Sequence, residues 1–132
     1  MTTVTGALIL RDDRFLICRR RTGQLHPLKW EFAGGKCEEG ETTAACLKRE
    51  LREELSIEAE IGREIERFTY TYPGRNPILL VFYLVTDFRG EPRNLVFEEI
   101  RWVARAELVQ FDFLEADKDL VKRLAAGTLL SG

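Results

Sequence analysis

The chain has 132 residues, of which 45% are hydrophobic and 32% charged, and its formal net charge at pH 7 is −2. This length and composition predict one soluble domain over residues 1–132, with enough apolar side chains for a core. No apolar run is long enough to span a membrane, and the slightly acidic charge argues against duplex nucleic acid as a partner. The three cysteines show no C-x-x-C spacing, so we expect reduced thiols and a cytoplasmic location.

The first third of the chain is predicted to be mostly extended. Two strands are expected at Val4–Leu10 and Arg14–Cys18, and a turn at Arg11–Asp13 joins them. A basic loop over Arg19–Leu28 follows. A short strand at Trp30–Ala33 then leads into a pair of glycines.

A helix is predicted over Thr43–Leu55, with Thr42 as its N-cap. At about 100° per residue, Glu50, Glu53 and Glu54 fall within an arc of roughly 100° on this helix. The apolar residues gather on a neighbouring arc, which is the expected buried side: Ala44, Leu47, Leu51 and Leu55.

The second half mixes strands with one more helix. Extended, alternating sequence over Glu58–Thr71 and a turn at Pro73–Pro77 precede a strongly apolar strand at Ile78–Thr86, which should be central. A further strand is expected at Ile100–Val103 and a helix at Ala116–Ala126. Its buried side and end are marked by Leu120, Val121, Leu124 and Gly127. This order, without regular βαβ repetition, predicts an α+β fold with a mixed sheet flanked by helices.

The three glutamates on one helix side point to a cation. Like charges at i,i+3 or i,i+4 cost ~0.2–0.5 kcal/mol per pair, and Mg²⁺ would reverse that cost because it prefers oxygen ligands. The alternative is a solvated face, neutralised by Lys48, Arg49 and Arg52. The preceding loop favours the cation, because Gly34–Gly35 permits a close approach of main chain to ligand. Lys36 adds a charge suited to phosphate.

The stretch from Gly35 to Ile57 resembles the Nudix box, G-x5-E-x7-R-E-U-x-E-E-x-G-U, in which U is aliphatic. The matching positions are Gly35, Glu41, Arg49-Glu50-Leu51, Glu53-Glu54 and Ile57. Ser56 stands where the family has a helix-ending glycine, which leaves the shape of the helix exit open. Trp30–Lys36, reading WEFAGGK, resembles the MutT-like branch, in particular its CTP pyrophosphohydrolase and 8-oxo-dGTP diphosphatase types.

The resemblance implies a Nudix-type α/β/α sandwich with a mixed β-sheet between helices. It also implies Mg²⁺ as the cofactor, with Mn²⁺ as an alternative. The implied metal ligands are the Gly34 carbonyl and the carboxylates of Glu50, Glu53 and Glu54. Glu53 also counts as catalytic, together with Arg49, which would orient the carboxylates.

The resemblance further implies contacts with the phosphates. Arg20 and Lys36 match basic positions near the phosphates in MutT-like enzymes. For Arg20 the alternative is a plain surface charge, because Arg19 and Arg21 flank it.

Relatives often carry one more glutamate, as ligand or general base, before a late strand. With the sequences aligned on Trp102, that position falls on Val96 here, and Glu98 and Glu99 lie two and three residues further on. Either a shifted Glu98 takes the catalytic role or the box glutamates suffice.

Base recognition is expected at Asp117. The pair Ala116-Asp117 resembles the segment that reads the nucleobase edge in the MutT-like branch. An aspartate accepts hydrogen bonds when ionised and gains one donor when protonated, so it suits an exocyclic amine, as on cytosine or guanine. The alternative is an aspartate that caps the second helix. A stacking surface would come from Phe82 or Tyr83, whichever faces inward.

The expected function is Mg²⁺-dependent hydrolysis of a nucleoside triphosphate, whether canonical, oxidised or methylated, to a monophosphate and pyrophosphate. The intact glutamate set favours an enzyme over a non-catalytic, nucleotide-sensing Nudix module. A hydrolase of dinucleotides or nucleotide sugars is the other alternative, although the compact length weighs against it. We expect a small-molecule nucleotide substrate and a monomer, with a dimer as the alternative.

Overall fold

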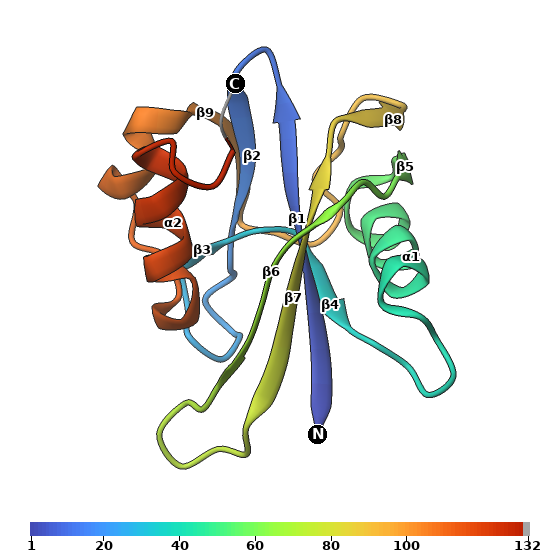
Figure 1. Cartoon of the computed structure of the whole chain (residues 1–132), viewed down its shortest axis with the longest axis vertical. Coiled ribbons are helices and arrows are strands. Elements are labelled where there is room, and N and C mark those ends of the chain that lie inside the picture. The colour runs from blue at the N-terminus through green and yellow to red at the C-terminus, as the bar shows by residue number, and fades with distance from the viewer. Residues whose placement is uncertain (131–132) are drawn as a thin grey trace. The chain divides into compact units, whose positions relative to one another are not determined.

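A computed structural model describes residues 1–130 (Figure 1). It contains two compact units. Unit 1 comprises Met1–Ile9 and Ala33–Val96, and unit 2 comprises Leu10–Phe32 and the chain from Phe97 onward. Within the described residues, no helix is long and apolar enough to cross a membrane.

Unit 1 is built on a mixed sheet. Strand β1 (Thr2–Arg11) runs parallel to β7 (Ile78–Val85), with Thr2 opposite Ile78 and Ile9 opposite Val85. Strand β6 (Glu64–Tyr70) pairs antiparallel with β7, and β4 (Gly34–Lys36) pairs antiparallel with β1. The apolar strand β7 therefore lies between β1 and β6, which confirms its central position.

Two features of the sheets were not predicted. Strand β5 (Glu58–Glu60), the start of the stretch predicted to be extended, pairs with the unpredicted strand β8 (Asp87–Arg89) in a separate two-stranded sheet. The glycine loop also forms β4, whereas the strand predicted at Trp30–Ala33 ends at Glu31. Both β4 and β5 are too short to show an alternating pattern.

Helix α1 (Thr43–Leu55) has the predicted bounds and lies beside β4 (Figure 1). The Thr42 side chain accepts a hydrogen bond from the Ala45 amide at 3.1 Å, as an N-cap should. The buried side consists of Cys46, Leu47, Leu51 and Leu55. Ala44, predicted to be buried, is only half-buried. Cys46 lies on the buried side instead, where its thiol contacts the Thr5 hydroxyl and the Gly35 carbonyl.

The exit of α1, whose shape the sequence left open, is formed by Ser56 instead of a glycine. Ser56 adopts the left-handed conformation, at φ 58° and ψ 36°, and its amide donates to the Arg52 carbonyl. A non-glycine residue costs roughly 1–2 kcal/mol in this conformation. A glycine costs about 0.5–1 kcal/mol in unfolded-chain entropy.

We therefore expect Ser56→Gly to raise the free energy of unfolding by up to about 1 kcal/mol. Urea denaturation of the two proteins measures this difference. Ser56→Ala should leave stability nearly unchanged, because alanine retains the Cβ that causes the strain. A destabilised Ser56→Gly protein would contradict the expectation.

Unit 2 centres on β2 (Arg14–Arg19), which pairs antiparallel with β9 (Glu99–Ala104) and with β3 (Trp30–Glu31). The last two residues of β1 also pair with the start of β2. The predicted turn between β1 and β2 is present, with Asp12 and Asp13 at positive φ.

The C-terminal segment differs from its prediction. Two 3₁₀ helices, η1 (Arg105–Gln110) and η2 (Glu115–Asp117), precede helix α2 (Lys118–Ala125). The helix thus begins at Lys118 instead of Ala116, because the chain first makes a tighter turn. Its predicted buried side is confirmed for Leu120, Val121 and Leu124, and Gly127 follows its end at φ 75°. The α+β class with a mixed sheet is as predicted.

Candidate active site

The glycine pair brings β4 close to its neighbours in unit 1. A Cβ on Gly34 would lie 2.0 Å from the Thr5 carbonyl oxygen, and Gly34 has φ 153°. A Cβ on Gly35 would lie 2.5 Å from a carboxylate oxygen of Glu50. The backbone therefore requires glycine at Gly34, whereas a larger residue at Gly35 would displace the Glu50 side chain.

Arg49 forms ion pairs with three of the nearby carboxylates. Its Nε is 2.7 Å from Glu41, and its Nη1 is 2.9 Å from Glu50 and 3.2 Å from Glu53. Its Nη2 also donates to the Lys36 carbonyl at 3.2 Å. Arg49 thus joins the loop to the acidic face of α1. The carboxylates are not a freely solvated row.

The other candidate counter-charges of α1 are placed differently. Arg52 forms an ion pair with Glu58 at 2.7 Å. Lys48 forms no ion pair with the described residues. Within residues 1–130, Arg49 is the cation that pairs directly with Glu50 and Glu53.

The protonation behaviour of Glu41 and Glu50 reflects their surroundings. Hydrogen bonds from Arg49, and next from the Glu38 amide, lower the pKa of Glu41 to about 2. Burial raises the pKa of Glu50 and the charge on Glu53 adds to this, while Arg49 opposes both. Glu41 is thus an ionised anchor for the Arg49 guanidinium group.

The donor set suits a hard cation, although it is not arranged around one. Within residues 1–130, no three His, Cys, Asp or Glu side chains are grouped as a metal site. Glu50 and Glu53 turn to Arg49, and Glu54 accepts the Gly34 amide proton at 3.0 Å. All the candidate donors are oxygens, which matches Mg²⁺ chemistry. The Glu53 side chain is 58% exposed, so it can reorient without disturbing the core.

Arg20 lies in unit 2 and is not a plain surface charge. Its Nη1 donates to both carboxylate oxygens of Glu31 at 3.1 Å, and its Nε donates to the Leu25 carbonyl at 2.8 Å. Burial raises the pKa of Glu31, and Arg20 partly offsets this effect. The predicted contact between Arg20 and phosphate stays a prediction.

Asp117 belongs to the same group in unit 2. It is only 4% exposed and occupies the N-cap position of α2, but its side chain makes no capping hydrogen bond. Burial first, and then the charge of Glu31, raises the pKa of Asp117 to about 8, while Arg20 lowers it. A buried carboxyl group beside a second carboxylate is held neutral by its surroundings.

Glu31 is the residue that the sequence analysis missed. It stands in a short strand between Trp30 and Phe32, both of which are buried. Alternating apolar and polar residues are the ordinary pattern of a half-buried strand, so the sequence carried no signal that Glu31 pairs with Arg20.

The remaining candidates, Phe82, Lys36 and Glu98, lie outside the contacts described so far. Phe82 is the inward-facing aromatic residue, but it is 2% exposed and stacks on Phe68 at 6.0 Å between ring centroids. Its role in base stacking stays a prediction. Lys36 is exposed on β4. Glu98 is also exposed, and its amide donates to the Arg19 carbonyl at 2.8 Å.

Comparison with known proteins gives a consistent family. Residues 1–124 match the NUDIX domain. The chain is 35% identical to CTP pyrophosphohydrolase of Escherichia coli over 96% of this chain and 93% of that protein. It is 37% identical to 8-oxo-dGTP diphosphatase of Haemophilus influenzae, over 90% and 88% of the two chains. The solution structure of the E. coli ORF135 protein superimposes with a TM-score of 0.85, at 35% identity, over 96% of this chain and 90% of that one. With its glycine loop, Arg49 and glutamate-bearing helix, the chain belongs to the Nudix family.

Proposed function

We propose that the protein, acting as one domain over residues 1–132, hydrolyses a nucleoside triphosphate to a monophosphate and pyrophosphate. One water molecule is added across the anhydride between the α- and β-phosphates. The observation that carries this proposal is the group of carboxylates on α1, which Arg49 holds against the glycine loop. The named activities of the two similar relatives support the same reaction class. Cys18, Cys37 and Cys46 form no disulfide among the described residues, and thiols of this kind suit a reducing cytoplasm, which we propose as the location.

Nudix hydrolases generally use divalent metal ions, and we propose Mg²⁺ here, with Mn²⁺ as the alternative. The ligands would be Glu50, Glu53, Glu54 and the Gly34 carbonyl. A bound divalent cation lowers the pKa of water and neutralises phosphoryl oxygens. Arg49 would hold Glu50 and Glu53 on the same side of α1 through its two ion pairs.

Two cations of the chain would meet the phosphates. Lys36 presents an exposed ammonium group on β4, and a point charge of this kind suits phosphate. Arg20 would contribute part of its guanidinium group, because Glu31 engages only Nη1.

Glu98 is the candidate for a further base or ligand. We expect Glu98→Gln to lower kcat by roughly tenfold or more, since general-base roles contribute ~10²–10⁴-fold and the helix glutamates would share the task. Steady-state kinetics measures the change, and Glu99→Gln is the matched neighbour. A Glu98→Gln enzyme within about threefold of wild type would make this residue a surface charge.

The protonation state of Asp117 would determine which nucleobase it recognises. A neutral carboxyl group donates one hydrogen bond and accepts another, which matches the adjacent ring nitrogen and exocyclic amine of cytosine. An ionised carboxylate only accepts, which matches the two adjacent N–H donors of guanine. With its pKa raised to about 8, Asp117 is neutral at pH 7. We therefore propose a cytosine-type edge as the preferred base at neutral pH.

This proposal predicts a pH-dependent preference. As the pH rises through about 8, Asp117 ionises, and the ratio of kcat/KM for CTP to that for GTP should fall. The change should be about tenfold, because a lost or unpaired hydrogen bond is worth ~1–3 kcal/mol. In Asp117→Asn the amide donates and accepts at every pH, so the ratio should stay constant. A wild-type ratio that is independent of pH would refute the proposed role.

The free energy of unfolding should also depend on pH through the Asp117 carboxyl group. The folded-state pKa lies above the unfolded value, so the unfolded chain releases this proton first and stability falls as the pH rises toward about 8. Asp117→Asn should lack this component of the pH dependence. Comparing urea denaturation of the two proteins between about pH 5 and pH 9 isolates it.

The substrate class is tested with a panel of canonical, oxidised and methylated nucleoside triphosphates, with Mg²⁺ and product identification. Dinucleotides and nucleotide sugars belong in the same panel. A substantially higher kcat/KM for one of these than for every triphosphate would replace the proposal. Binding without turnover of any compound would indicate a sensing module.

A further inference from the structure

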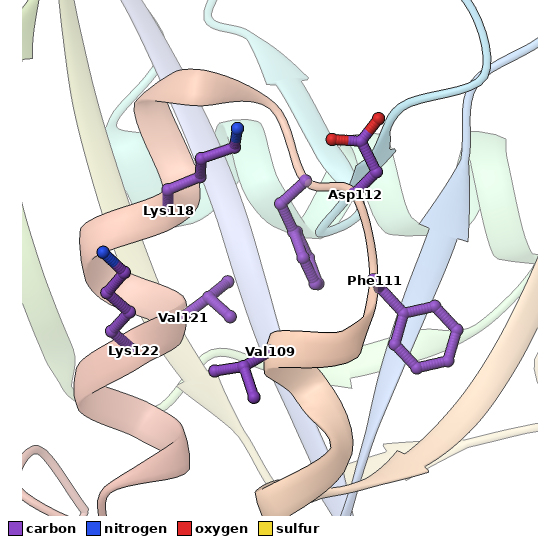
Figure 2. A pocket seen from close by; sticks show the side chains of 7 residues that line it. Val109, Phe111, Asp112, Lys118, Val121 and Lys122 are labelled. Atoms are coloured by element: carbon purple, nitrogen blue, oxygen red, sulfur yellow. The ribbon is translucent and has the colours of Figure 1, made fainter.

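Unit 2 contains a cavity of about 220 Å³ between η1 and α2 (Figure 2). Its apolar lining comes from Val109, Phe111, Phe113 and Val121. Val109 is 55% exposed, which leaves an apolar edge open to solvent. These side chains belong neither to the Nudix motif nor to the set formed by Arg20, Glu31 and Asp117. The volume is below the range of ~300–1,000 Å³ for drug-sized ligands, so the cavity suits a smaller molecule.

The rim of the cavity carries an excess positive charge. Asp112 is paired with Lys29 at 2.8 Å, and Lys118 is paired with Glu115. Lys122 has no ion pair among residues 1–130, and its side chain stands at the rim beside Val121 (Figure 2). The uncompensated charge is thus +1, from Lys122, next to an apolar surface. This combination complements a small molecule with an apolar body and one carboxylate.

The cavity walls continue into the elements that hold Glu31 and Asp117. The Trp30 amide donates to the Asp112 carbonyl at 2.9 Å, and the Leu114 amide donates to the Trp30 carbonyl at 3.0 Å. One wall is therefore bonded to the strand of Glu31. The other wall is α2, whose first residue follows Asp117 directly. A ligand that moves η1 away from α2 would therefore strain the hydrogen bonds to Trp30 and the backbone between Asp117 and α2.

We propose that this cavity binds a small apolar monocarboxylate and that its occupancy is transmitted to Glu31 and Asp117. The carboxylate would pair with Lys122, and the apolar body would lie against Val109, Phe113 and Val121. A ligand of this size should bind with a Kd on the order of 1 mM. Binding to this cavity does not require hydrolytic activity, so the two proposals can be tested independently.

The test is an NMR titration of the full chain, labelled with ¹⁵N, with 3-phenylpropionate. We expect amide shifts in residues 109–113 and 118–122, and shifts at Glu31 and Asp117 that follow the same binding curve. The neutral amide, 3-phenylpropanamide, should bind at least threefold more weakly, because the charge pair is lost. Equal affinity for the acid and the amide would overturn the assignment of the ligand class.

Two exposed substitutions keep the test independent of folding. Lys122→Glu should weaken binding of the acid roughly threefold or more, and Val109→Ser should weaken the acid and the amide alike. Arg123→Glu makes the same charge change at the next position of α2, outside the cavity lining, and should retain binding. Shifts that survive Lys122→Glu, or that never reach Glu31 and Asp117, would overturn the proposal.

Discussion

Replacing Glu53 by glutamine should lower kcat by at least ~100-fold, the scale of losing a key electrostatic stabiliser. The substitution removes one negative charge from the candidate ligand set and keeps the shape of the side chain. In the structure Glu53 contacts Arg49 at 3.2 Å and is 58% exposed. An exposed ion pair contributes only about 0–1 kcal/mol to stability, so the fold should survive.

Measurement of kcat at saturating substrate and Mg²⁺, together with a urea denaturation curve, separates the two effects. Glu60→Gln is the matched control, because Glu60 is an exposed glutamate of the same unit, outside the Arg49 group. It should leave both kcat and stability unchanged. A Glu53→Gln enzyme with near wild-type kcat would remove Glu53 from the catalytic set.

The second large effect is expected at Gly34. A Cβ at this position would meet the Thr5 carbonyl oxygen at 2.0 Å and would require a side chain at φ 153°. Backbone strain costs about 1–3 kcal/mol, and overpacking costs a similar amount. Gly34→Ala should therefore lower the free energy of unfolding by ~2–6 kcal/mol.

The adjacent Gly35→Ala variant is the contrast. Its Cβ would meet the flexible end of Glu50 instead of backbone, so stability should change little. Glu50 would be displaced, however, and kcat should fall. Similar stability losses in the two variants would show that the pair acts only through the backbone.

The sequence predicted the elements that carry a clear pattern of apolar residues along several turns or positions. The bounds of α1 followed from a capping threonine and an apolar stripe, and β7 was recognised because it is almost wholly apolar. The short strands β4 and β8 were missed, and β5 was not separated from the extended stretch predicted at Glu58–Thr71, because two or three residues carry no periodicity. The start of α2 was displaced by η2, whose tighter turn resembles the first turn of a helix in sequence.

The site was predictable where its residues are close in sequence. Arg49 and the three glutamates share one helix, and the glycine pair precedes it directly. The ion pair of Arg20 with Glu31, and the effect of both charges on Asp117, were not predictable, because these residues come near one another only after the chain has folded. Local sequence also suggested a cap at Asp117, whereas tertiary burial determines its actual environment.

The most direct test is product analysis by ion-exchange chromatography during hydrolysis of a nucleoside triphosphate with Mg²⁺. We predict nucleoside monophosphate and pyrophosphate in equal amounts from the earliest time points. We also predict that a chelator of divalent ions stops the reaction and that added Mg²⁺ restores it. Inorganic phosphate and nucleoside diphosphate as the first products, or hydrolysis that continues at the same rate in the chelator, would contradict the proposed function.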